Sequence, residues 1–124
     1  MKDNRPVNLD LGAMRWPITA IASITHRVTG VVLFVGMAIL LWALERSLSG
    51  PQGFTVVVEC LSSPIAKLVI WGVLAAGIYH SLAGIKHIVM DFGFGESMEG
   101  GVLGAKIVIG LSAVLIMLAG VWIW

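Results

Sequence analysis

Three uncharged, apolar windows decide what this chain can fold into. Each lacks Asp, Glu, Lys and Arg and is rich in Leu, Ile, Val, Ala and Gly; they are Val28–Leu44, Leu68–Ile85 and Ile107–Trp124. Each has nearly the ~20 residues that a helix needs to cross ~30 Å of hydrocarbon. A soluble helical bundle would need polar faces, which these windows lack. The sequence therefore predicts an all-α integral membrane fold with three transmembrane helices, over about residues 17–46, 64–89 and 104–124.

The composition agrees with one small membrane domain covering residues 1–124. Hydrophobic residues make up 58% of the 124 residues and charged residues only 12%, whereas soluble proteins average about 25% charged residues. A cleavable signal peptide is excluded for the first window, because about 27 residues, including Asp3 and Asp10, precede its apolar core. We expect no large soluble lobe.

Charge and cysteine content exclude several classes of function. The net charge of +1 provides no basic patch for nucleic acid. The only cysteine, Cys60, excludes an intrachain disulfide, a CxxCH haem attachment and a cysteine-ligated iron–sulfur cluster within this chain alone. The simplest interpretation of Cys60 is a small buried hydrophobic residue.

The basic residues predict an orientation. Two, Arg46 and Lys67, flank the first connection, whereas six lie ahead of the first span or in the second connection: Lys2, Arg5, Arg15, Arg27, Lys86 and Lys106. The positive-inside rule then puts the N-terminus and residues 86–106 in the cytoplasm and the C-terminus on the other side. Four tryptophans agree, since they fall at the outer ends of the spans, where indoles favour the headgroup region. They are Trp42, Trp71, Trp122 and Trp124.

Local signals mark the helix ends. Pro17 is expected in the first turn of the first helix, and Ser63-Pro64 has the pattern of an N-cap and first-turn pair. Ser47–Ser63, with its Gly50-Pro51 breaker, is predicted to be an outer loop. The glycine-rich segment Asp91–Gly104 is predicted to be a cytoplasmic turn.

His80 is the most informative polar residue, because it lies within an uncharged window. An imidazole at that depth has no water to pair with, so it is either a ligand or buried against a partner. On a helical wheel, four small residues lie within about 60° of it: Ala76, Gly77, Ala83 and Gly84. They could form the flat clearing that a porphyrin needs. They could equally allow two helices to pack closely, with His80 hydrogen-bonded across the seam.

The other two histidines limit what this chain can hold alone. His80 and His87 lie two turns apart, about 10.5 Å along a helix axis, whereas two axial ligands of one iron lie only ~4 Å apart. His26 is expected near the cytoplasmic start of the first span, some turns from His80 in depth. A six-coordinate haem would therefore need its second ligand from another polypeptide, which predicts a heteromeric helical bundle.

A second polar group comprises Ser23, His26 and Arg27, at positions i, i+3 and i+4 of one helix face. If the helix starts near Pro17, Arg27 lies inside the membrane boundary, where it needs an anion, a carbonyl group or room to extend to the interface. A haem propionate or a quinone oxygen would suit it, and Ser23 could donate to the same quinone. The alternative, which composition alone favours, is an interfacial arginine with Ser23 packed between helices.

Several segments resemble the cytochrome b anchor subunit of bacterial succinate dehydrogenase, most closely the enterobacterial type. They are RPVNLDL (Arg5–Leu11), RWPITAIASITHRVTGV (Arg15–Val31) and YHSLAGIKHIVMDFG (Tyr79–Gly93). The resemblance covers nearly the whole chain and combines an SxxHR element with an HxxxGxxHxxxD element. It implies a complex with a flavoprotein subunit carrying FAD, an iron–sulfur subunit carrying the clusters, and a second small membrane anchor. It also implies a multi-pass location in the bacterial inner membrane.

The resemblance implies a role for individual residues. His80 matches an axial ligand of haem b, with the opposite ligand a histidine of the second anchor. Ser23 and Arg27 match the ubiquinone site, and His26 and Arg27 match positions near the haem propionates. Of two second-tier residues, His87 and Asp91, the aspartate is a structural or proton-path candidate, although a simple helix-end charge is favoured.

The implied function is that of a subunit that catalyses nothing alone. It would anchor the flavoprotein and iron–sulfur subunits and help to pass electrons from succinate to ubiquinone in respiration and the tricarboxylic acid cycle. Two alternatives stay open at this point. One is a three-span structural or transport subunit without haem; the other is a fumarate reductase-type anchor, or one that uses menaquinone.

Overall fold

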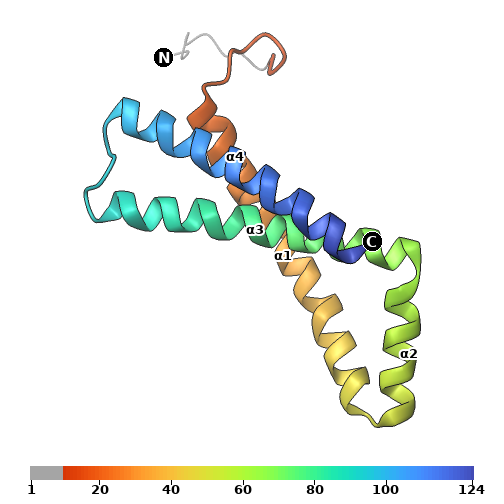
Figure 1. Ribbon diagram of the computed structural model, residues 1–124. Helices are drawn as coiled ribbons and strands as arrows, with labels where there is room; N and C mark the ends of the chain where they lie inside the picture. Colours follow the sequence, from red (N-terminus) through yellow and green to blue (C-terminus); the bar gives the residue numbers. More distant parts are fainter. Residues whose placement is uncertain (1–9) are drawn as a thin grey trace, which may run out of the picture.

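The computed structural model describes residues 10–124, so the predictions that involve Lys2, Asp3 and Arg5 lie outside the described residues. The described part consists of four helices and, from residue 10 onward, no strand: α1 (Ile18–Leu48), α2 (Pro51–Ser62), α3 (Pro64–Asp91) and α4 (Met98–Ile123) (Figure 1). The all-helical prediction is confirmed.

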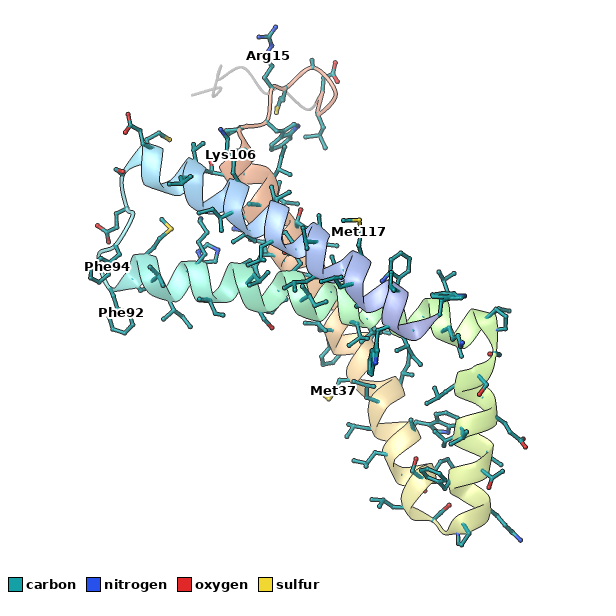
Figure 2. All side chains as sticks on the ribbon, in the orientation of Figure 1. Arg15, Met37, Phe92, Phe94, Lys106 and Met117 are labelled. Atoms are coloured by element: carbon teal, nitrogen blue, oxygen red, sulfur yellow. The ribbon has the colours of Figure 1, made fainter. Side chains whose placement is uncertain are left out.

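Helices α1, α3 and α4 are long and apolar enough to cross a membrane. They contain 31, 28 and 26 residues, with mean hydropathies of 2.2, 1.7 and 2.4 in their most apolar stretches. Large apolar side chains point away from the bundle; Figure 2 shows this for Met37 on α1 and Met117 on α4, which are 55% and 61% exposed. Lipid is the solvent that such a surface requires. The prediction of three candidate spans is confirmed.

The three long helices pack through small residues. α3 and α4 form an antiparallel hairpin, and α1 crosses this pair obliquely, so that its second half diverges toward α2 (Figure 1). Buried positions along the seams are mostly small, as in other membrane bundles; they include Ala22 and Gly36 of α1, Ala76 and Ala83 of α3, and Gly101 and Ala105 of α4. A small core cluster of Tyr79, Ala83 and Val108 lies between α3 and α4.

Helix α2 corrects the prediction that Ser47–Ser63 is a loop. Gly50 has a φ of 127°, which turns the chain after α1, and Pro51 then occupies the first turn of a new helix. Gly53 and Val57 are spaced i, i+4 and form the side of α2 that packs on α1, where Val57 is buried. The breaker dipeptide therefore separates two helices and does not mark a loop.

The remaining helix ends are close to those predicted, with one difference. Ser63 caps α3 by accepting a hydrogen bond from the backbone N–H of Ala66 at 3.3 Å, as expected. Helix α4 begins at Met98, ahead of the predicted position, because Ser97 Oγ caps it by accepting from the Gly100 N–H at 3.0 Å. The connecting turn is therefore shorter than predicted, and Gly100 belongs to the helix.

The crossing of α1 and α3 should depend on Gly36. A Cβ atom at Gly36 would lie 2.9 Å from Val73 Cγ1, and overpacking of this kind costs about 1–3 kcal/mol. We expect Gly36→Ala to lower the midpoint of thermal unfolding of the purified assembly in detergent. Gly110→Ala is the matched control, because a Cβ there meets nothing within 4 Å and Ala is the better helix former. Equal midpoints for the two variants would contradict the prediction.

Candidate functional site

All three histidines gather where α1 crosses α3. The imidazole rings of His26 and His80 are stacked, with centroids 4.1 Å apart and an interplanar angle of 25°. The His87 ring lies 5.3 Å from that of His26, tilted by 41°. The prediction that His26 lies some turns from His80 in depth is wrong. The start of α1 at Ile18 is close to the predicted start, but α1 crosses α3 obliquely, which the prediction did not include.

The Nδ1 atom of His80 is hydrogen-bonded across the seam. It lies 3.1 Å from the main-chain carbonyl oxygen of His26 and 3.3 Å from Thr29 Oγ1. A carbonyl oxygen only accepts, so Nδ1 carries the proton and donates. In a neutral imidazole the lone pair is then on Nε2, which makes no hydrogen bond within residues 10–124. His80 is thus held in the tautomer that a metal ligand requires.

Two residues of α1 that sequence reasoning missed hold the His80 ring. Thr29 Oγ1 lies 2.9 Å from the carbonyl oxygens of Thr25 and His26, in addition to its contact with His80. Gly30 leaves room for the ring, because a Cβ atom there would lie 3.1 Å from His80 Cε1. The available signal was the position of Thr29 and Gly30, three and four residues after His26 and so on its helix face.

The small residues around His80 serve close helix packing. Ala76 and Ala83 are 6% and 3% exposed, so they do not line an open clearing, and that interpretation is wrong for them. A Cβ on Gly77 would lie 3.7 Å from Leu33, and one on Gly84 would lie 3.9 Å from His26 Nε2. Of the two alternatives left open by the sequence, packing describes these residues better.

The arrangement still fits one half of a haem site. His26 and His80 cannot bind one iron between them, because axial nitrogens lie ~4 Å apart with the iron in the plane of each ring, whereas these rings are stacked face to face. His80 offers a free Nε2. The Nε2 atom of His26 is buried and has no hydrogen-bond partner in the described part of the chain, so a polar group is missing beside it. The two Nε2 atoms, of His80 and His26, suit a haem whose second ligand comes from another chain.

The predicted quinone residues lie on the same stretch of α1. Ser23 is half-buried and Arg27, one turn later, is exposed and forms no ion pair with residues 10–124. A guanidinium group in this position is available to an anion or a carbonyl oxygen. Asp91 is the last residue of α3 and is also exposed. Nothing in the fold brings Asp91 into contact with the stacked histidines.

Tyr79 and Trp71 join the helices around the site through main-chain carbonyl groups. The Tyr79 hydroxyl donates to the Ala22 carbonyl oxygen at 3.0 Å, next to His80 and between α3 and α1. The Trp71 indole N–H donates to the Ile116 carbonyl oxygen at 2.9 Å, which ties α3 to α4. Trp71 is half-buried and takes part in helix packing, whereas Trp42 is exposed; both lie toward the outer ends of their spans, as predicted.

Comparison with known proteins identifies the family. Residues 1–119 match the model of the succinate dehydrogenase/fumarate reductase transmembrane subunit. The chain belongs to this family. It is 42% identical to the succinate dehydrogenase cytochrome b556 subunit of Coxiella burnetii over the full length of both chains. The identity is 32% with the cytochrome b556 subunit of Paracoccus denitrificans, covering 94% of this chain and 90% of the relative.

The similarity extends to mitochondria. The chain is 31% identical to the cytochrome b560 subunit of pig succinate dehydrogenase, over 74% of this chain and 56% of the relative. The predicted role of a membrane-anchor subunit of succinate dehydrogenase is confirmed, and the alternative of an unrelated transport subunit is set aside. The chain is a multi-pass membrane protein of this anchor family. The relatives include Coxiella, Paracoccus, Rickettsia and pig proteins, so they do not single out the enterobacterial type.

The Tyr79 hydroxyl should stabilise the packing around His80. We expect Tyr79→Phe to lower the stability of the detergent-solubilised complex by about 0.5–1.5 kcal/mol, the range for a hydrogen bond between helices in a membrane. The effect is modest because the Ala22 carbonyl keeps its helical partner. Thermal release of this subunit from the complex measures it. An unchanged midpoint would show that the 3.0 Å contact contributes nothing.

Proposed function

We propose that this chain supplies one axial ligand, His80 Nε2, to a haem b that it shares with the second small anchor subunit. We also propose that Ser23 and Arg27 belong to a ubiquinone site in a complex with the iron–sulfur and flavoprotein subunits. The observation that carries the haem proposal is the hydrogen bond from His80 Nδ1 to the His26 carbonyl oxygen at 3.1 Å. The names of the relatives, which include cytochrome b556, agree with it.

The tautomer of His80 is what makes the ligand role chemically sound. A backbone acceptor on Nδ1 leaves the lone pair on Nε2, orients the ring and raises its basicity. Gly30 lets the ring approach α1 without a clash, so the imidazole keeps one orientation. A bound haem would supply a one-electron redox centre whose potential depends on its axial ligands and surroundings. The other anchor subunit would supply the second ligand, because the His26 ring is stacked on His80 and cannot share one iron with it.

His26 has a separate role in the proposal. Its Nε2 atom is buried and unpartnered, and a buried imidazole nitrogen of this kind needs a donor or an acceptor. A propionate oxygen would satisfy it, with Arg27 one residue further along α1 adding positive charge. His26 stacks on His80. It therefore lies beside the proposed ligand but is not itself a ligand.

The quinone role rests on Ser23 and Arg27. Both lie in the first half of α1, on the side of the bundle where the histidines gather, and Arg27 has no counter-ion among the described residues. A serine hydroxyl can donate to a quinone carbonyl oxygen, and a guanidinium group stabilises the negative charge that develops on it during reduction. Protons would come from nearby water. His87 and Asp91, which lie in the C-terminal part of α3, stay weaker candidates for this site.

The proposal includes an orientation and a direction. The basic residues predict a cytoplasmic N-terminus and a periplasmic C-terminus in the bacterial inner membrane. Electrons from succinate would reach the quinone through the flavin and the iron–sulfur clusters of the partner subunits. The reverse reaction, fumarate reduction with menaquinol, uses the same architecture. Parallel assays of succinate–ubiquinone and quinol–fumarate activity, with extraction of the bound quinone, decide between the two directions.

Replacing His80 should remove haem ligation. We expect His80→Leu to abolish the six-coordinate b-type signal in the reduced-minus-oxidised spectrum of the purified complex, because leucine has no nitrogen to bind the iron in place of His80 Nε2. The control is Ser62→Leu on α2, far from the histidines, where the hydroxyl donates to the Val58 carbonyl oxygen and forms no other hydrogen bond with residues 10–124. A wild-type spectrum from the His80→Leu complex would place the ligand elsewhere.

Replacing Arg27 should affect quinone reduction more than assembly. Loss of a charged hydrogen bond costs about 1.5–3 kcal/mol, so we expect Arg27→Leu to lower kcat/KM for ubiquinone by roughly 10- to 100-fold. Subunit composition of the purified complex reports assembly. Arg46→Leu, an exposed arginine in the last turn of the same helix, is the matched control. Unchanged ubiquinone turnover in Arg27→Leu would remove this residue from the site.

A further inference from the structure

Helix α2 is the element that the proposed function does not use. It joins the end of α1 to the start of α3, at the opposite end of these helices from the stacked histidines. Its 12 residues extend only about 18 Å, too short to cross ~30 Å of hydrocarbon. Figure 1 shows that α2 runs across the end of α3 and is not aligned with it. Because its two neighbours are membrane spans, α2 is tethered at the membrane boundary at both ends.

The residues of α2 are divided by polarity around its axis. Val57, which is buried, and Gly53 face α1. A Cβ atom on Gly53 would collide with Ser49 Oγ and with the carbonyl oxygen of Arg46, so the glycine allows the hairpin to close. Thr55 and Glu59, two residues to either side of Val57, lie on the opposite side of the helix.

Large apolar side chains occupy one flank between these two sides. Phe54, Val58 and Leu61 are 58%, 47% and 37% exposed, and on the helical wheel they lie between the side that faces α1 and the polar side. If water covered them, this apolar area would be unfavourable. The adjoining ends of the two spans also expose large apolar side chains: Leu48 of α1 and Ile65 of α3 are 77% and 78% exposed.

We propose that α2 is an interfacial helix that rests on lipid in the leaflet opposite the histidines. Phe54, Val58 and Leu61 insert at the boundary between headgroups and acyl chains, and Thr55 and Glu59 face water. Such helices lie in the membrane plane with an apolar face buried by roughly 5–10 Å. Lipid is the occupant because α2 joins two membrane spans, and the ends of both spans next to α2 also expose large apolar side chains. This inference is independent of haem and quinone binding.

Thiol accessibility tests the side of α2 that faces water. Cys60, the only cysteine of the chain, is replaced by Ser, and single cysteines are placed at Phe54, Val58, Thr55 and Glu59. The whole complex is reconstituted in phosphatidylcholine vesicles, treated with a membrane-impermeant maleimide, and this subunit is resolved on a gel. We expect the Phe54→Cys and Val58→Cys variants to react about tenfold more slowly, because an apolar interface disfavours the reactive thiolate. Equal rates at all four positions would overturn the proposal.

Photo-crosslinking distinguishes lipid from a protein partner as the cover of this flank. A benzophenone amino acid is introduced at Phe54 and, as the matched control, at Glu59 in the complex in the same vesicles. After irradiation, mass spectrometry of this subunit is expected to detect a phospholipid adduct from position 54 and none from position 59. A cross-link from position 54 to another subunit, or the absence of a lipid adduct there, would overturn the assignment to lipid.

Discussion

The close approach of α1 and α3 is the constraint on which the site depends. It exists because Gly30 and Gly36 have no side chain at the crossing, where a Cβ would press on His80 and Val73 respectively. This approach brings the His80 imidazole within 3.1 Å of a main-chain carbonyl oxygen of the neighbouring helix. Without it, a polar ring would lie in hydrocarbon with no acceptor, at a cost of several kcal/mol. The close packing of α1 on α3 therefore also provides the hydrogen-bond acceptor that His80 needs.

Two other polar side chains in the apolar spans follow the same rule. The Tyr79 hydroxyl and the Trp71 indole each donate to a carbonyl oxygen of a neighbouring helix. A helical carbonyl group has a second lone pair, so it accepts such a bond without losing its own helical partner. Membrane helices gain little from the hydrophobic effect when they associate, and such bonds with close van der Waals packing hold them together. In this chain they connect α3 to both of its long neighbours.

The sequence predicted the spans well because the absence of charge over a window is a direct consequence of the bilayer. It failed where information from three dimensions was needed. The Gly50-Pro51 breaker suggested a loop, since nothing local to the dipeptide reveals that a helix resumes after it. The depth of His26 was misjudged because the oblique crossing of α1 over α3 cannot be read from a helical wheel. The roles of Thr29 and Gly30 became visible only with that crossing, whereas the place of His80 in an uncharged window had already singled it out.

The acceptor for His80 Nδ1 belongs to the backbone of α1 and not to a side chain. A point substitution at position 26 changes the imidazole that stacks on His80, yet it leaves the carbonyl oxygen in place as long as α1 remains helical. The orientation of the His80 ring therefore does not depend on which side chain is present at position 26. The side chains around His80 can therefore change during evolution one at a time, while the backbone of α1 keeps the His80 ring in the same orientation.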